Sequence, residues 1–167
     1  MTWEDEQSCP ICHSEQMVYP YGPERSKILI VSEFPGGDEI KMGRPMVGRN
    51  GTVLRQELGR VGIDLRSLRI CNLWLHPKNE DAGCLTHSAK LVLKECRGRK
   101  FVLLLGSEPV KYFTGLGVMN VAGLVVTSEL ITKPILFACP QAAIVFHGGC
   151  GEFRLSMEKF AKLVNGR

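Results

Sequence analysis

The stretch Ile28-Leu29-Ile30-Val31-Ser32-Glu33-Phe34-Pro35-Gly36-Gly37 decides the fold. Its first four residues are a short apolar run, which is typical of a buried strand. The loop that follows, residues 33–51, holds two prolines and five glycines. Ligands of open α/β sheets usually bind in loops at the carboxyl ends of strands, where glycines allow the backbone to approach them. Glu33, the first residue after the strand, is therefore the first candidate functional residue.

Strands and helices alternate on both sides of this stretch. We expect strands at 27–33, 68–75, 101–106, 121–130 and 134–138, and helices at 51–61, 84–96 and 152–164, with a short helix near 110–113. Several of the strands are apolar on both faces, which favours a mainly parallel sheet with helices on each side. The sequence thus predicts the α/β class, as a three-layer α/β/α sandwich. With 167 residues, a single domain spanning 1–167 is expected.

The composition excludes few binding partners but limits the cellular locations to be expected. Residues 1–6 are acidic and lack an apolar core, and no apolar run is long enough to span a membrane. We therefore expect a protein of the cytoplasm or nucleoid with no membrane partner. A monomer is expected by default, since the sequence carries no sign of an oligomeric state. The net charge of +4 permits a nucleic-acid partner. Two basic clusters are either solvated helix faces or phosphate contacts: Arg44, Arg49, Arg55, Arg60, Arg66 and Arg69, then Lys94, Arg97, Arg99 and Lys100.

Several segments match a known family in order along the chain. Glu33-Phe34-Pro35-Gly36, Asp38-Glu39 and Gly43-Arg44-Pro45-Met46-Val47-Gly48-Arg49 resemble the first motif of the iron–sulfur uracil-DNA glycosylases, families 4 and 5. The similarity continues through Ile70-Cys71-Asn72 and Leu104-Leu105-Gly106 and covers residues 27–140. It implies a DNA repair enzyme of base excision, which flips uracil or a modified pyrimidine out of DNA and hydrolyses its N-glycosidic bond.

The resemblance also implies roles for individual residues. Glu33 would assist the attacking water and the sugar cation, unless it only caps nearby loop amides. Asn72 would read the base, since an amide offers one donor and one acceptor, although asparagines at strand ends are often turn formers. The remaining candidates are Pro35 and Gly36 for backbone approach to the base, Phe34 and Met46 for packing on it, and Arg44 and Arg49 for the DNA backbone.

The late motif departs from the family pattern. Cys139-Pro140-Gln141 stands where the family has a histidine before proline, which donates a hydrogen bond to the oxygen of the departing base. A thiol is a weak donor, and the loss of one preorganised donor typically lowers the rate about a hundredfold or more. Gln141 or His147 could compensate. Two alternatives therefore stay open: a catalytically silent DNA-binding member, and a hydrolase of small nucleosides or nucleotides.

The seven cysteines, an odd count, favour reduced thiols and a metal site over a disulfide framework. Cys9 and Cys12 have the spacing of half a metal site, which would tie residues 1–26 to the domain; Cys12-His13 also fits a covalent haem motif, which the enzyme-like remainder of the chain argues against. The resemblance implies a 4Fe-4S cluster and suggests Cys84 and His76 as the other two ligands, with Cys96 as a rival for the fourth. Three thiolates and one imidazole also suit structural zinc.

Overall fold

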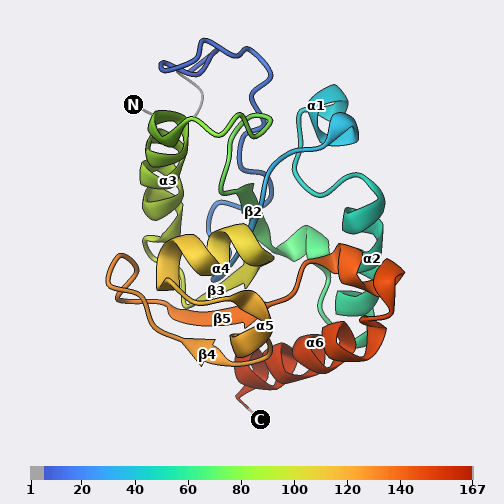
Figure 1. Ribbon diagram of the computed structural model, residues 1–167. Coiled ribbons are helices and arrows are strands. Elements are labelled where there is room, and N and C mark those ends of the chain that lie inside the picture. The colour runs from blue at the N-terminus through green and yellow to red at the C-terminus, as the bar shows by residue number, and fades with distance from the viewer. Residues whose placement is uncertain (1–5, 167) are drawn as a thin grey trace.

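A five-stranded sheet with the order β2-β1-β3-β5-β4 forms the centre of the molecule (Figure 1). The computed structural model describes residues 6–166. Four strands are parallel and β4 pairs antiparallel with β5. The bounds are β1 Ile28–Ser32, β2 Arg69–Asn72, β3 Phe101–Leu105, β4 Val125–Val126 and β5 Ile135–Cys139. The predicted α/β class and mainly parallel sheet are confirmed.

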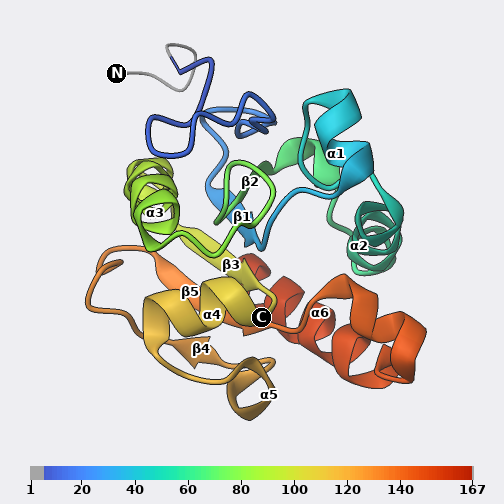
Figure 2. The same ribbon diagram turned by 45° about the horizontal axis from the view of Figure 1, so that its top comes forward.

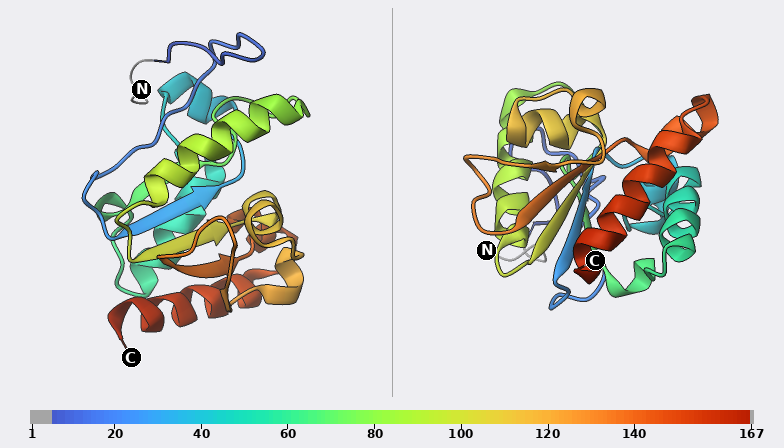
Figure 3. Two further views of the ribbon diagram at one scale, coloured as in Figure 1. Left: turned by 90° about the vertical axis from the view of Figure 1, so that its left-hand side faces the viewer. Right: turned by 90° about the horizontal axis from the view of Figure 1, so that it is seen from below.

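Helices cover both faces of the sheet, which gives three layers (Figure 3). On one face α3 (Ala82–Cys96), α4 (Ser107–Thr114) and α5 (Val118–Val121) pack on one set of alternate strand residues, including Leu29, Val102 and Leu104. On the other face α2 (Arg49–Arg60) and α6 (Cys150–Asn165) pack on the other set, including Ile30, Leu103 and Leu105. Successive strand side chains point to opposite faces of the sheet. Both sets are buried because helices cover both faces.

Several segments differ from the sequence prediction: the strand expected at 68–75 ends at Asn72 as β2, helix α5 was not expected, and two further differences lie after β1 and around β4. The loop after β1 contains the short helix α1 (Gly37–Met42), and the strand expected at 121–130 is reduced to the two residues of β4. Gly123 has a left-handed φ of 77°, and the Ser128 hydroxyl accepts hydrogen bonds from the amides of Leu130 and Ile131. The chain therefore turns away from the sheet on both sides of β4. Two 3₁₀ turns, η2 (Leu65–Ser67) and η3 (Ala142–His147), complete the fold.

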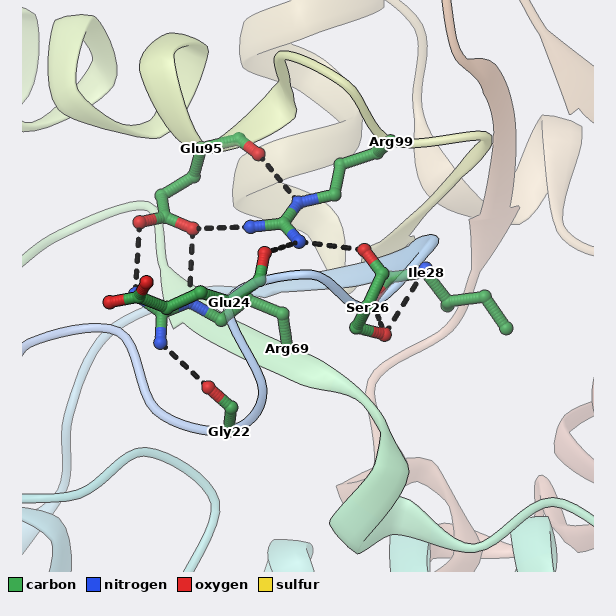
Figure 4. Close-up of polar contacts among 7 residues, drawn as sticks. All are labelled: Gly22, Glu24, Ser26, Ile28, Arg69, Glu95 and Arg99. Carbon is green, nitrogen blue, oxygen red and sulfur yellow. Dashed lines mark hydrogen bonds and ion pairs between the residues drawn. The ribbon is translucent and has the colours of Figure 1, made fainter.

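A buried ionic cluster fixes the chain before β1 to the amino ends of the strands (Figure 4). Arg69 and Arg99 both pair with the Glu95 carboxylate at 3.0 Å. Arg69 also donates to the Gly22 carbonyl at 2.7 Å, and Arg99 donates to the Ser26 carbonyl at 2.6 Å. These two arginines, considered above for phosphate contacts, are thus internal crosslinks at the sheet edge opposite the Glu33 loop.

The N-terminal segment lies beside the first turn of α3 and the loop after β2 (Figures 1 and 2). The Val18 amide donates to the Leu75 carbonyl at 2.6 Å, and Tyr21 forms an isolated antiparallel bridge with Ile70. Nearer the start, the Glu6 carboxylate lies 2.9 Å from His87 Nε2 on α3. Within residues 6–166, none of the helices has the length and apolar character needed to cross a membrane.

Candidate active site and metal centre

A cavity of about 240 Å³ opens at the carboxyl ends of β1 and β2. The loop from β1 to α2 forms most of its wall, and Asn72 at the end of β2 closes it. Six residues predicted for the site from sequence line this cavity together: Phe34, Gly36, Met46, Arg49, Asn72 and Gln141. Segments that are 107 residues apart at their extremes, from Phe34 to Gln141, therefore converge on one pocket.

Asn72 lines this cavity and carries an unused hydrogen-bond donor. Its side chain is only 2% exposed, and its Nδ2 has no hydrogen-bond partner among the described residues. A buried amide without a partner typically costs about 1–3 kcal/mol, so such groups are rare unless a ligand satisfies them. The register pairs Asn72 with Ser32 at the end of β1, which holds the amide at the mouth of the sheet.

Glu39 holds the two sides of the glycine loop together. Its Oε2 accepts from the Gly36 amide at 3.2 Å and its Oε1 accepts from the Gly48 amide at 2.9 Å. The first bond caps α1 and the second reaches the residue before α2. One carboxylate thus joins the starts of two helices across the cavity. Glu39 belonged to the recognised motif, but its structural role was not predicted.

Met46 forms part of the cavity wall in a strained backbone conformation. Its φ is 57°, in the left-handed region that a methionine rarely adopts. The adjacent turn requires close contact, because a Cβ on Gly51 would lie 1.8 Å from the Met46 carbonyl oxygen. Phe34 lines another part of the wall and is 43% exposed. An apolar thioether and an exposed ring therefore border the pocket, as expected for packing on a flat base.

Glu33 lies beside the cavity rather than in its lining. Its Oε2 accepts from the Glu108 amide at 3.3 Å, at the start of α4. Gly106 has a φ of 103°, and a Cβ there would lie 2.7 Å from the Glu33 carboxyl carbon, so only glycine fits. Burial raises the pKa of the Glu33 carboxyl; the Glu108 amide lowers it, the Glu108 carboxylate raises it and Lys78 lowers it.

Lys78 and Glu108 are functional candidates that sequence reasoning missed. Lys78 Nζ lies 2.5 Å from Glu108 Oε1, and both groups act electrostatically on Glu33. The Lys78 charge partly offsets the Glu108 carboxylate, which opposes ionisation of Glu33. No motif spacing marks these residues, because Lys78 lies in the loop after β2 and Glu108 in the first turn of α4, and only the fold brings both to Glu33.

Four predicted residues lie outside the cavity lining. Cys139 is fully buried in the core on the α2 and α6 face, where burial raises the pKa of its thiol, and it does not line the cavity as its predicted contact with the base would require. Pro35 and His147 are also absent from the lining. Arg44 borders a larger neighbouring hollow of about 680 Å³, which shares Met46 with this cavity, and donates there to the Tyr21 hydroxyl at 3.2 Å. That hollow contains neither Asn72 nor Glu33.

The four residues proposed as metal ligands come together from three segments. The donor atoms of Cys9, Cys12, His76 and Cys84 all lie within 4.8 Å of one another. Cys96, the rival ligand, stays at the far end of the unbroken helix α3, within the core. The group of three cysteines and one histidine therefore has the composition and closeness to bind a metal.

Comparisons with known proteins agree with this architecture. The model of the uracil DNA glycosylase superfamily matches residues 19–151, which span the whole sheet and the cavity. This chain belongs to the uracil-DNA glycosylase superfamily. A Type-4 uracil-DNA glycosylase from Thermotoga maritima is 37% identical over 67 residues, which are 40% of this chain and 35% of that protein. The similarity thus spans about a third of the relative's length.

Proposed function

We propose that this superfamily member is a DNA glycosylase, acting as a monomer in the cytoplasm or at the nucleoid, that excises uracil or a modified pyrimidine. The observation that carries the proposal is the unpaired Nδ2 of Asn72 in a cavity bordered by Met46 and Phe34. A pyrimidine extruded from DNA would offer that amide a carbonyl oxygen and would offer the apolar wall a flat face. Membership of the superfamily supports DNA as the substrate.

Hydrolysis would break the bond between sugar C1′ and base nitrogen and form a bond from C1′ to water oxygen. The base leaves with the bonding electron pair, so positive charge develops on the sugar. The ionised Glu33 carboxylate would stabilise that charge and accept a proton from the attacking water. Its raised pKa makes it a stronger base than an ordinary glutamate, and the Lys78 charge keeps part of it ionised.

Gln141 is our candidate for the donor that the family histidine supplies. It lines the cavity, whereas the Cys139 thiol faces the core. Its amide would donate to a base oxygen as negative charge collects there. Gln141→Ala should then lower the single-turnover rate about a hundredfold. Gln56→Ala, on the exposed side of α2, is the matched control and should leave the rate unchanged.

Arg49 would contact a DNA phosphate at the cavity mouth. Its guanidinium lies 3.5 Å from the centre of the Phe146 ring, which orients it beside the pocket. Replacing it with glutamine should weaken DNA binding and make the logarithmic salt slope shallower by about 0.9 for duplex DNA. Lys162→Gln, in the last turn of α6 and away from the cavity, should leave the slope unchanged.

The deciding experiment is a cleavage assay on oligonucleotides that contain uracil or modified pyrimidines. Alkali-labile abasic sites should appear with wild-type protein and vanish with Glu33→Gln. A protein that binds DNA with a steep salt dependence but leaves every oligonucleotide intact would instead be the silent binding member, which the buried Cys139 favours. Hydrolysis of free nucleosides without salt-dependent DNA binding would establish the small-molecule alternative.

A further inference from the structure

The spacing of the metal-ligand group identifies the kind of metal centre that it fits. Cys9 Sγ and Cys84 Sγ lie 3.8 Å apart, and Cys12 Sγ lies 3.6 Å from His76 Nε2. Two thiolates at about 2.3 Å from one tetrahedral zinc ion lie about 3.8 Å apart. A thiolate and an imidazole nitrogen on the same ion lie about 3.5 Å apart, with bonds of about 2.3 and 2.0 Å. These two distances match a single tetrahedral ion, whereas the remaining pairs of donor atoms are separated by up to 4.8 Å.

The same spacing does not fit the iron–sulfur cluster that the family resemblance implies. In a 4Fe-4S cluster each ligand binds a different iron, so the ligand atoms stand about 6 Å apart. All four donor atoms here lie within 4.8 Å of one another. A two-iron cluster would also separate the ligands of its two irons beyond this distance. The group is therefore more compact than the ligand sets of either kind of cluster.

The surroundings prepare His76 and Cys84 to bind one cation. His76 Nδ1 lies 2.8 Å from the Pro77 carbonyl oxygen, so Nδ1 carries the proton and Nε2 keeps its lone pair toward Cys12. Metal-bound histidines typically donate their second ring nitrogen in this way. The Asn79 amide donates to Cys84 Sγ at 3.5 Å, which fixes the position of the sulfur.

The turn that carries Cys9 and Cys12 is closed by two backbone hydrogen bonds. The His13 amide donates to the Cys9 carbonyl at 2.8 Å, and the Cys9 amide donates to the Ser14 carbonyl at 2.9 Å. His13 reverses the chain with a φ of 61°. This closed turn directs both thiols toward the loop after β2. The other two ligands lie in that loop and in the first turn of α3.

We infer that Cys9, Cys12, His76 and Cys84 bind one zinc ion in place of the 4Fe-4S cluster. Four protein ligands leave no open position for water, so the ion is structural. It would join the N-terminal segment, the loop after β2 and the start of α3. The identity of the metal does not depend on whether the cavity excises a base.

Metal analysis of the untagged full chain tests this inference. Anaerobic purification from medium that contains both iron and zinc should yield a colourless protein with one zinc per chain and no acid-labile sulfide. Substitution with cobalt should give the visible spectrum of a tetrahedral site with thiolate ligands. About four irons and four sulfides per chain, with broad absorption in the blue region of the visible spectrum, would overturn the zinc inference. One iron per chain, or metal-free protein with oxidised cysteines, would overturn it equally.

Two variants separate zinc binding from folding. His76→Cys should keep one zinc per chain, because four thiolates also form a tetrahedral site. In the cobalt-substituted protein it should raise the thiolate charge-transfer intensity by about a third, since three thiolates become four. Cys150→Ser, at the start of α6 and outside the group, should change neither zinc content nor spectrum. An unchanged cobalt spectrum in His76→Cys would refute histidine ligation.

Discussion

At the scale of single residues, Asn72 has the clearest functional signature. Because its Nδ2 has no internal partner, Asn72→Ala removes no hydrogen bond from that atom and should change the free energy of unfolding by less than about 1 kcal/mol. The same change should lower the rate of base excision about a hundredfold and weaken discrimination between pyrimidines. Single-turnover rates and thermal melts would measure both effects.

The matched control for Asn72 is Asn120→Ala, on the exposed helix α5. It should alter neither rate nor melting temperature. If Asn72→Ala lost several kcal/mol of stability together with its activity, Asn72 would be a structural turn former and its base-reading role would be refuted.

Replacing Glu33 should lower the excision rate but raise the stability of the fold. Burial raises the pKa of its carboxyl, so folding disfavours the ionised form and this residue's contribution to stability is lost as pH rises through the raised pKa. Glu33→Gln should therefore melt at a higher temperature than wild type near neutral pH, and the gain should shrink as acid protonates the wild-type carboxyl. Its excision rate should fall about a hundredfold or more.

The wild-type rate supplies a second check on Glu33. It should decline on the acid side at a pH above that of an ordinary glutamate, because the proposed reaction uses the ionised carboxylate, whose pKa is raised. Lys78→Met removes a charge that favours ionisation and should move this decline to higher pH. A melting temperature of Glu33→Gln that is unchanged at every pH would contradict the desolvated carboxylate.

At the scale of elements, the conformation of the glycine loop is stabilised by the carboxylate of Glu39. Glu39→Ala removes the two hydrogen bonds to the Gly36 and Gly48 amides and should lower the free energy of unfolding by about 1–2 kcal/mol. It should also raise hydrogen exchange across residues 36–48 and reduce the excision rate, since the cavity wall loosens. Lys41→Ala, exposed on the same helix α1, should do none of these.

Elements differed in how well sequence predicted them, for physical reasons. The runs of β1 and β3 were recognisable because both faces of these strands are buried, so every residue is apolar. Helix α1 was missed because its six residues depend on the bond from Glu39 to distant Gly48. β4 was overestimated because its apolar residues lie on an exposed edge, where Val125 is 56% exposed.

The site residues were also predicted unevenly: those placed by a motif or a strand end were found, and those placed only by the fold were not. Asn72 and the loop were predicted because a motif and a strand end place them together. Cys139 was misplaced because neighbouring strand residues face opposite layers: Ala138 packs toward α3 and Cys139 toward α6, and the motif position does not determine that parity. The burial of Arg99 could not be predicted either, since it depends on carbonyls more than 70 residues earlier in the chain.

At the scale of the whole molecule, the metal centre and the cavity are connected through one loop. His76, a member of the candidate metal-ligand group, begins the loop at residues 76–81, and Lys78 in the same loop pairs with Glu108, whose amide donates to Glu33. Removing the metal with a chelator should therefore free residues 6–17 and this loop, and should also lower the excision rate. The sheet should persist, because Val18 and Tyr21 are hydrogen-bonded to Leu75 and Ile70 without the metal.

Hydrogen exchange with and without chelator measures this connection. Peptides from residues 6–17 and 76–84 should lose protection, while β1, β3 and β5 should keep it, because these three strands lie side by side in the buried centre of the sheet. Lys78→Met with metal bound should still move the acid-side decline of the excision rate to higher pH. Its hydrogen-exchange pattern should be that of the wild type. If chelation unfolded the sheet as well, the metal would stabilise the whole domain. If it left the rate unchanged, the loop would not transmit the state of the metal centre to Glu33.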